Sequence, residues 1–245
     1  MRKVIIALSL MFNGNFKEIL NAIEQKQAPT ENALDQAKNI DCITLLDKDY
    51  PDCFKPTGTP PFVLYTKGNK ELLKNRRNFI LIGDKNPSLE GLKNTQNLIK
   101  ELSQLETTIY FNCQTGLNRM ALSYAIREKM NIVLVSNTGI NNVPQFLSKS
   151  EYQYIIDNGL IISEYPNDVT PQQNHEYSRI IASLVDYVVM VDETDIYNNF
   201  SLIEWALQYG KDICAVPNSV GNFTNKLIKE GARLIENGTD LLDLG

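Results

Sequence analysis

Short apolar runs alternate with amphipathic stretches along most of the chain. From residue 78 onward, these runs are apolar at nearly every position rather than at every second one. This pattern indicates strands buried on both faces, as in a parallel sheet covered by helices on both sides. The predicted strands are residues 79–82, 108–111, 132–135, 160–163, 187–191 and 213–216.

The stretches between these strands repeat their apolar residues with the helical period. Strands and helices that alternate along the chain predict a doubly wound α/β fold with a mostly parallel sheet. The predicted helices are residues 89–105, 120–129, 151–158, 179–184 and 200–209.

The first 40 residues look different and predict a small N-terminal region of strand and helices, residues 1–40. We expect a first strand at residues 4–12, then helices at 16–25 and 31–39, with Thr30 as the N-cap of the second helix. The apolar start resembles a signal peptide, but no small-residue cleavage pattern follows it. Two short strands, residues 42–46 and 62–65, then open a main domain of residues 41–245.

The composition is that of a soluble globular protein, with 43% hydrophobic and 22% charged residues among 245. No apolar run reaches the roughly 18 residues that a membrane span needs. The four cysteines form no CxxC pair, and the chain holds a single histidine, His175, so a zinc site lacks its ligands. We therefore expect a cytoplasmic protein with reduced thiols, no metal and no membrane contact.

The signatures of common enzyme classes are absent from the sequence. It has no Walker loop and no GxGxxG, HExxH or GxSxG motif. A Ser-His-Asp triad would have to use His175, which lies in a polar stretch beside Glu176. We expect a protein that is not an enzyme and that needs no cofactor. Because the net charge is −5, any nucleic-acid site must be a local basic patch.

A ligand site is expected at the carboxyl ends of the strands, where doubly wound folds bind ligands and helix starts favour phosphate. Cations at such a site would hold the backbone of a nucleic-acid strand. The candidate cations at or near strand ends are Lys85, Arg119, Arg179 and Lys211.

Aromatic and acidic residues also gather near the predicted strand ends. Tyr177, Tyr197 and Phe200 have faces on which bases could stack, although packing in the core or at its rim is favoured. Acids also follow strands at Glu164, Asp192 and Glu193. Without a nucleophile or a set of metal ligands beside them, we expect these acids to orient loops rather than to catalyse.

Several blocks of sequence, in one order over about residues 43–244, resemble the DprA/Smf family of DNA-processing proteins. They include PPFVLYTKGNKELL from residue 60, GLIISEYP from residue 159, RIIASLVDYVVMVDE from residue 179 and LIKEGARLIENGTDLL from residue 227. The resemblance implies an extended Rossmann-like fold whose loops bind single-stranded DNA.

The loops depart from the family pattern more than the strands do. Gly83-Asp84-Lys85 stands where the family has Gly-Ser-Arg, and a second family loop ends here in Gly116-Leu117-Asn118, with an amide in place of an acid. A basic run of the family reads NHEYSR here, and only its last residue, Arg179, is kept. With the cations at strand ends, the predicted DNA-binding residues are Gly83, Lys85, Gly116, Asn118, Arg119, Arg179 and Lys211.

Members of the resembled family bind and protect single-stranded DNA and help to load the RecA recombinase in recombination and natural transformation. The resemblance implies the same function here, and a homodimer whose contact uses the later helices. Two other classes stay open: a Rossmann protein that binds a nucleotide-like ligand, and a protein-interaction module that no longer binds DNA. Relatives of the first kind carry PGGxGTxxE, which NNFSLIEWA at residues 198–206 does not match, whereas the altered loops and the negative charge favour the second.

Overall fold

The computed structural model describes residues 1–112, 115–167, 177–194, 199–219 and 223–241. The chain forms two compact units, each built from two separate stretches of sequence. The first unit consists of residues 1–70 and 135–177, and the second of residues 71–134 and 178–245. The boundary that we expected between residues 40 and 41 falls inside the first unit.

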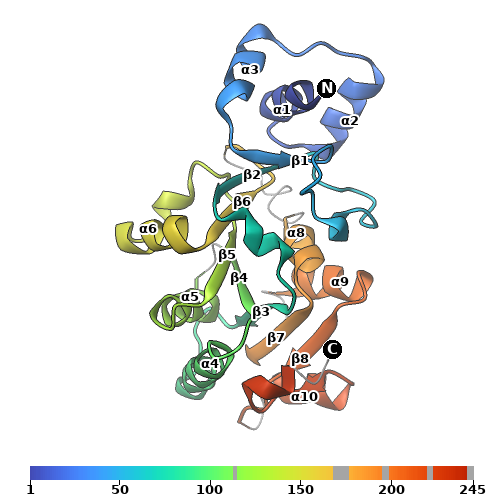
Figure 1. Cartoon of the computed structure of the whole chain (residues 1–245). Helices are drawn as coiled ribbons and strands as arrows, with labels where there is room; N and C mark the ends of the chain where they lie inside the picture. The colour runs from blue at the N-terminus through green and yellow to red at the C-terminus, as the bar shows by residue number, and fades with distance from the viewer. Residues whose placement is uncertain (113–114, 168–176, 195–198, 220–222, 242–245) are drawn as a thin grey trace. The chain divides into compact units, whose positions relative to one another are not determined.

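The first unit begins with three helices, α1 (Arg2–Met11), α2 (Phe16–Glu24) and α3 (Glu31–Gln36), and the short 3-10 helix η1 (Ala37–Asn39) (Figure 1). The strand expected at residues 4–12 is wrong, because this run forms α1. A short apolar run is compatible with a buried helix as well as with a strand. Thr30 caps α3 as predicted, since its Oγ1 accepts a hydrogen bond from Ala33 N at 3.3 Å.

The helices of this unit share a small apolar core. Leu8 of α1 packs against Ile19 and Ala22 of α2, and all three side chains are buried. At the edge of this cluster the rings of Phe16 and Phe62 stack with their centroids 5.1 Å apart. Burial of these side chains, rather than the propensity of such short helices, is what stabilises the helical region.

The strands of the first unit run in the order β1 (Cys42–Thr44), β2 (Val63–Gly68), β6 (Leu160–Ser163). Both pairs are antiparallel, with Ile43 opposite Leu64 and Thr66 opposite Ile162. Helix α6 (Lys149–Asn158) leads into β6 and starts with a capping box formed by Ser148 and Glu151. The 3-10 helices η2 (Asp52–Phe54) and η4 (Val143–Gln145) lie in the connections.

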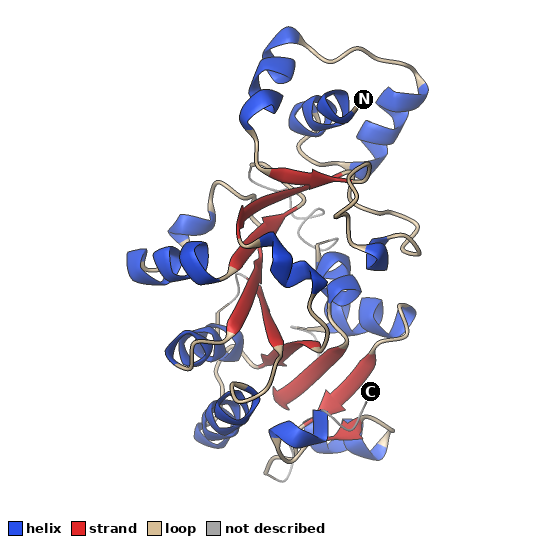
Figure 2. Ribbon diagram, viewed as in Figure 1, coloured by secondary structure: helices blue, strands red, loops and turns tan. Residues whose placement is uncertain are grey.

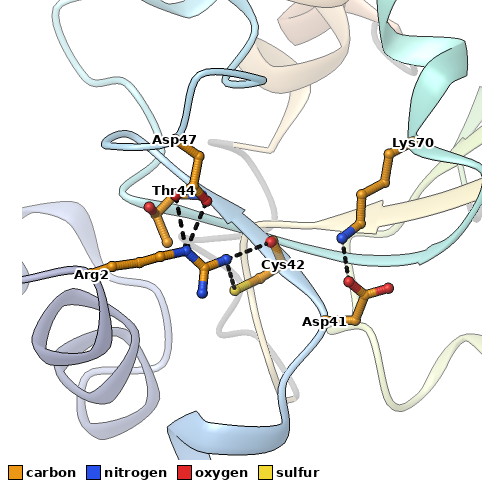
Figure 3. A network of polar contacts seen from close by, with 6 residues as sticks. All are labelled: Arg2, Asp41, Cys42, Thr44, Asp47 and Lys70. Carbon is orange, nitrogen blue, oxygen red and sulfur yellow. Dashed lines mark hydrogen bonds and ion pairs between the residues drawn. The ribbon is translucent and has the colours of Figure 1, made fainter.

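Arg2 ties α1 to β1 and to the turn that follows it (Figure 3). Its Nε donates to both carboxylate oxygens of Asp47, at 2.9 and 3.0 Å, and its Nη2 donates to Cys42 O at 2.9 Å. Asp47 Oδ2 also accepts from Thr44 N at 2.8 Å. Burial acts to raise the pKa of the Asp47 carboxyl, but the hydrogen bonds from Thr44 and Arg2 outweigh it and hold that pKa below its usual value.

The second unit is built on a parallel sheet with strand order β5-β4-β3-β7-β8-β9. The recorded registers, β3 with β4 and β7, β7 with β8, and β8 with β9, are all parallel. Apart from the last residue of β5, the strands belong to this unit. They are β3 (Asn78–Gly83), β4 (Thr108–Asn112), β5 (Asn131–Val135), β7 (Tyr187–Asp192), β8 (Asp212–Ala215) and β9 (Arg233–Leu234).

Helices cover this sheet on both sides (Figures 1 and 2). α4 (Leu89–Leu102) packs beside α5 (Leu117–Arg127) on one side, and α8 (Ser178–Leu184) packs beside α9 (Phe200–Gln208) on the other. The predicted α/β, doubly wound, mostly parallel architecture is therefore confirmed. The sequence analysis did not predict α10 (Phe223–Lys229), β9 or η6 (Gly238–Leu241), nor the 3-10 helices η2, η3 (Lys70–Lys74) and η4. Within the described ranges, no helix has both the length and the apolar character to cross a bilayer.

Candidate functional site

The strand order of the second unit reverses between β3 and β7. The chain runs from β3 through β4 to β5 on one side, and from β7 through β8 to β9 on the other. Because paired strands here are parallel, their carboxyl ends meet at one edge. Doubly wound folds bind ligands in the crevice outside such a reversal. The loops that follow β3, β4 and β7 are therefore the candidate site.

A polar network around the buried side chains of Asp84 and Asp192 joins the loops after β3 and β7. Asp84 Oδ2 accepts hydrogen bonds from the N and Oγ1 of Thr194, at 2.9 and 2.6 Å, and Asp84 N donates to Asp192 O at 2.7 Å. The Asp192 carboxylate accepts from Ser88 N at 2.6 Å and from Asn218 Nδ2 at 2.9 Å. These contacts give Asp192 the loop-orienting role that we expected, and they extend it to Asp84.

The other two acids differ in where they lie. Glu193 is buried directly after β7, and its Oε2 accepts from Asn199 Nδ2 at 2.5 Å. The same Asn199 amide donates to Gly83 O at 3.4 Å, so Glu193 also helps to fix the end of β3. Glu164 is buried after β6 and belongs to the first unit.

Two glycines allow the loops after β3 and β4 to lie against each other and against β7. A Cβ atom on Gly83 would lie 2.5 Å from Asp192 O and 2.7 Å from Leu117 Cδ1. Gly116 has φ +80° and ψ −142°, and a Cβ atom there would lie 2.5 Å from Lys85 Cα. The backbone of Lys85 is therefore held against the start of α5.

Two of the predicted cations lie where α5 begins. Lys85 is exposed, and Arg119 in the first turn of α5 is partly exposed, with its Nη1 donating to Ser123 Oγ at 3.1 Å. Gly116, the N-cap of α5, offers no side-chain acceptor, and the first turn carries no acid. A helix start without acids attracts anions through its N–H groups. The structure thus brings Gly83, Lys85, Gly116 and Arg119 to one edge.

Asn118 lies in the same turn but faces inward. Its Oδ1 accepts from Asn112 N at 3.2 Å, and its Nδ2 donates to Leu81 O at 2.9 Å. The side chain is buried between the ends of β3 and β4. In this arrangement the amide joins two strands, and its polar atoms are already used.

Arg179, the second residue of α8, is only 4% exposed. The guanidinium of Arg179 lies near the hydroxyl of Tyr209. Burial raises the pKa of that hydroxyl, and the positive charge of Arg179 acts to lower it. Its guanidinium is therefore turned into the protein rather than presented to a ligand. A buried arginine stays charged and depends on partners within the fold.

Lys211 corrects one expectation. It directly precedes β8, whose first residue Asp212 is in register with Tyr187 at the start of β7. Lys211 therefore lies at the amino ends of the strands, opposite the edge that carries Gly83 and Gly116. Its Nζ donates to Ser183 O in the last turn of α8, at 3.1 Å, which is a favourable place for a cation.

The aromatic candidates are also separated. Phe200 is 50% exposed at the start of α9. Tyr177 is buried and belongs to the first unit. Tyr197 and His175 lie outside the described residues.

Sequence reasoning missed the residues that complete the polar network, Thr194, Asn199 and Asn218. A signal for them existed, because all three are short polar side chains that follow β7 or β8 closely. Such residues bond readily to loop backbone and carboxylates.

Comparison with known proteins assigns the chain to a family. The family model described as DNA recombination-mediator protein A matches residues 41–244. The DNA processing protein DprA of Bacillus subtilis is 26% identical over 231 residues, which is 91% of this chain and 78% of that protein. The DNA processing protein DprA of Streptococcus pneumoniae is 28% identical over 205 residues, or 81% of this chain and 72% of that protein.

Solved structures agree with this assignment. The X-ray structure of DprA from Streptococcus pneumoniae has a TM-score of 0.79 at 25% identity and covers 94% of this chain and 82% of that one. DNA processing protein A from Helicobacter pylori, studied for its unique single-stranded DNA binding mode, has a TM-score of 0.68 at 22% identity, with 84% and 94% covered. The second likeness shows the fold alone. Because the family model matches most of the residues of this chain, the chain belongs to the DNA recombination-mediator protein A family, the DprA/Smf proteins.

Proposed function

We propose that this chain is a cytoplasmic DNA-processing protein that binds and protects single-stranded DNA, helps to load RecA in recombination and natural transformation, and has no enzymatic activity. The match of residues 41–244 to the family carries the proposal. The Helicobacter pylori relative, which has a single-stranded DNA binding mode, supports it. The edge beside β3 and β4 provides the chemistry, with the exposed Lys85, the partly exposed Arg119 and a helix start that carries no acid.

At that edge, Lys85 and Arg119 are the residues that we assign to the DNA backbone. Lys85 is exposed and its backbone rests against Gly116, so its side chain leaves the surface next to the first turn of α5. Two hydrogen bonds from Thr194 fix the carboxylate of Asp84, which keeps its negative charge and therefore weakens the binding of a phosphate beside Lys85.

Binding of single-stranded DNA is expected to be weak and sensitive to salt. If two to four phosphates are neutralised, the logarithm of the association constant falls against the logarithm of salt concentration with a slope of about −1.4 to −2.8. Lys85→Gln should make the slope less negative by about 0.7, the value of one phosphate contact. Fluorescence anisotropy of a labelled oligothymidine, measured over a series of salt concentrations, gives both slopes.

A matched control is Lys93→Gln, which removes an exposed lysine from α4 in the same unit. Its slope should equal that of the unaltered protein. Equal slopes for the Lys85 and Lys93 variants would remove Lys85 from the DNA site. A protein that binds no single-stranded DNA even at low salt would instead favour the protein-interaction module, in line with the net charge of −5.

Loading of RecA is expected to shorten the lag before RecA filaments form on single-stranded DNA covered by a single-strand-binding protein. A factor that binds both the strand and the recombinase lowers the cost of filament nucleation by raising the local concentration of RecA. The lag can be followed by the DNA-dependent ATPase activity of RecA with and without this protein. An unchanged lag at a protein concentration that saturates the DNA would contradict RecA loading.

We also propose a homodimer that uses α9. Phe200 and Leu207 are 50% and 62% exposed, and they are seven residues apart, so they lie on the same face of the helix. Leu207→Glu places a charge on that face and should shift the protein to the monomer in sedimentation velocity. Leu89→Glu is the matched control, because Leu89 is 87% exposed at the start of α4 and should leave the dimer intact. If the unaltered protein sediments as a monomer even at high concentration, this dimer contact is excluded.

A further inference from the structure

We propose that the second unit carries a second phosphate-binding surface, at the amino ends of its strands, formed around Arg76 and Arg77. We name it the amino-edge pocket; its lining residues are Lys74, Asn75, Arg76, Arg77, Glu106 and Asn131. Its ligand class is the phosphate backbone of a nucleic-acid strand. That this strand is single-stranded DNA rests on the proposed function.

The amino-edge pocket lies opposite the edge that holds Lys85 and Gly116. Arg77 directly precedes β3, Glu106 comes shortly before β4, and Asn131 is the first residue of β5. Together these residues line an open pocket with a volume of about 640 Å³. The pocket is therefore separate from the loops that follow β3 and β4.

The backbone that presents the two arginines is fixed on both sides. Asn75 Nδ2 donates to Thr108 Oγ1 at 2.9 Å, and Thr108 N donates to Arg77 O at 3.2 Å. Asn78 N donates to Asp186 Oδ2 at 2.8 Å, and Asn78 Nδ2 donates to Asn75 O at 3.1 Å. A segment held in this way loses little further freedom when a ligand binds.

The conformation of Arg77 is uncommon for its residue type. Its φ is +63°, in the left-handed region that L-residues rarely adopt. Such a conformation is unfavourable for a residue with a side chain and persists where the surrounding contacts impose it. Arg76 and Arg77, two successive residues, both line the pocket.

The charges of the pocket favour an anion. Arg76 and Arg77 are both exposed. Among the described residues, neither guanidinium makes a hydrogen bond or an ion pair. Lys74 is a third cation, and it forms an ion pair with Glu71, with 2.9 Å between Nζ and Oε1. Glu106 is the one carboxylate among the lining residues. In a chain of net charge −5, this concentration of positive charge within four residues stands out.

The shape and donors of the pocket favour a strand over a small molecule. The guanidinium fork matches the oxygen geometry of phosphate and forms paired hydrogen bonds with it. The pocket is open and its lining is polar and charged, so it has no apolar walls to enclose a compact ligand. Successive phosphates of an extended strand, however, can meet successive cations at a surface.

The test compares two double variants of the full chain that remove the same charge. Arg76→Gln/Arg77→Gln removes the proposed contacts, and Lys93→Gln/Lys100→Gln removes two exposed lysines of α4. Binding of a labelled oligothymidine is measured over a series of salt concentrations, and melting curves check that both variants fold. The arginine variant should lose about tenfold in affinity at low salt, with a slope less negative by about 1.4, while the lysine variant stays within about twofold.

Each other outcome decides a separate question. Equal losses in the two variants would show a general effect of net charge and overturn the amino-edge pocket. No loss in the arginine variant, combined with a loss in Lys85→Gln, would overturn the pocket and leave the proposed function standing. If the unaltered chain binds no oligothymidine, the proposed function fails. The pocket then survives as a phosphate site only if inorganic tripolyphosphate shifts the amide NMR signals of Asn75 and Asn131, and does not do so in the arginine variant.

Discussion

Replacement of Gly116 by alanine is expected to lower the free energy of unfolding by about 3–5 kcal/mol, because two separate costs combine. The backbone angles φ +80° and ψ −142° lie in a region that essentially only glycine occupies. The added methyl group would also lie 2.5 Å from Lys85 Cα and 2.8 Å from Lys85 O, and closer still to Asp84 O. Since these atoms are backbone, no side-chain rotation relieves the clash, and the loop after β3 must move.

Gly210→Ala separates the two costs. Gly210 also has a left-handed φ, +66°, but no atom lies within 4 Å of the position of its Cβ. This variant should lose only about 1–2 kcal/mol, from backbone strain alone. Denaturation in guanidinium chloride measures both variants, and the Gly116 variant should also lose the DNA binding assigned to Lys85. A Gly116 variant as stable as the Gly210 variant would show that the two loops are not packed as described.

Asp192→Ala is expected to cost about 3 kcal/mol or more, because it leaves several groups of the polar network without their acceptor. The carboxylate accepts charge-assisted hydrogen bonds from Ser88 N and from Asn218 Nδ2, and each such bond contributes about 1.5–3 kcal/mol. The same side chain packs against Gly91 in the first turn of α4, where a Cβ would lie 2.5 Å from Asp192 Cγ. Its removal therefore opens a void between β7 and α4 as well.

The control for this variant is Asp35→Ala. Asp35 is exposed on α3 and pairs with Lys38 at 2.5 Å. Exposed ion pairs contribute little to stability, so no measurable change in the thermal midpoint is expected. For a protein of this size the Asp192 variant should melt about 6–12 °C lower. If both variants melt together, the network after β7 does not stabilise the fold.

The sequence was most informative where strands are buried on both faces. β3 and β7 are apolar along most of their length because helices cover both sides of the sheet, and the helical patterns on either side of each strand supported the prediction of buried strands. The run at residues 4–12 is just as apolar, but α1 buries Ile5, Ile6, Ala7 and Leu8 in succession, which hides the helical period. β9 has only two residues and both are exposed, so it leaves no pattern to detect.

The candidate site was less predictable, because a charge close to a strand end does not show where its side chain points. Arg179 and Asn118 lie in the first turns of α8 and α5, close to where helices were predicted to begin, yet both side chains are buried. Lys211 was predicted to lie at the site because it is close to a strand in the sequence. It precedes that strand, however, and therefore lies at the opposite edge of the sheet. The glycines were better guides, since Gly83 and Gly116 occupy positions where backbone segments approach closely, and that requirement can be recognised from the residue type.

The interleaved order of the two units sets the sequence of events as the chain leaves the ribosome. Residues 1–70 emerge first, but their unit is complete only when residues 135–177 have been made, after the first stretch of the other unit. At that point β3 and β4 have been synthesised while β7, the second neighbour of β3, has not. The nascent protein therefore holds an unpaired apolar strand edge until its last third is translated, and this interval is when chaperones would be of most use to it.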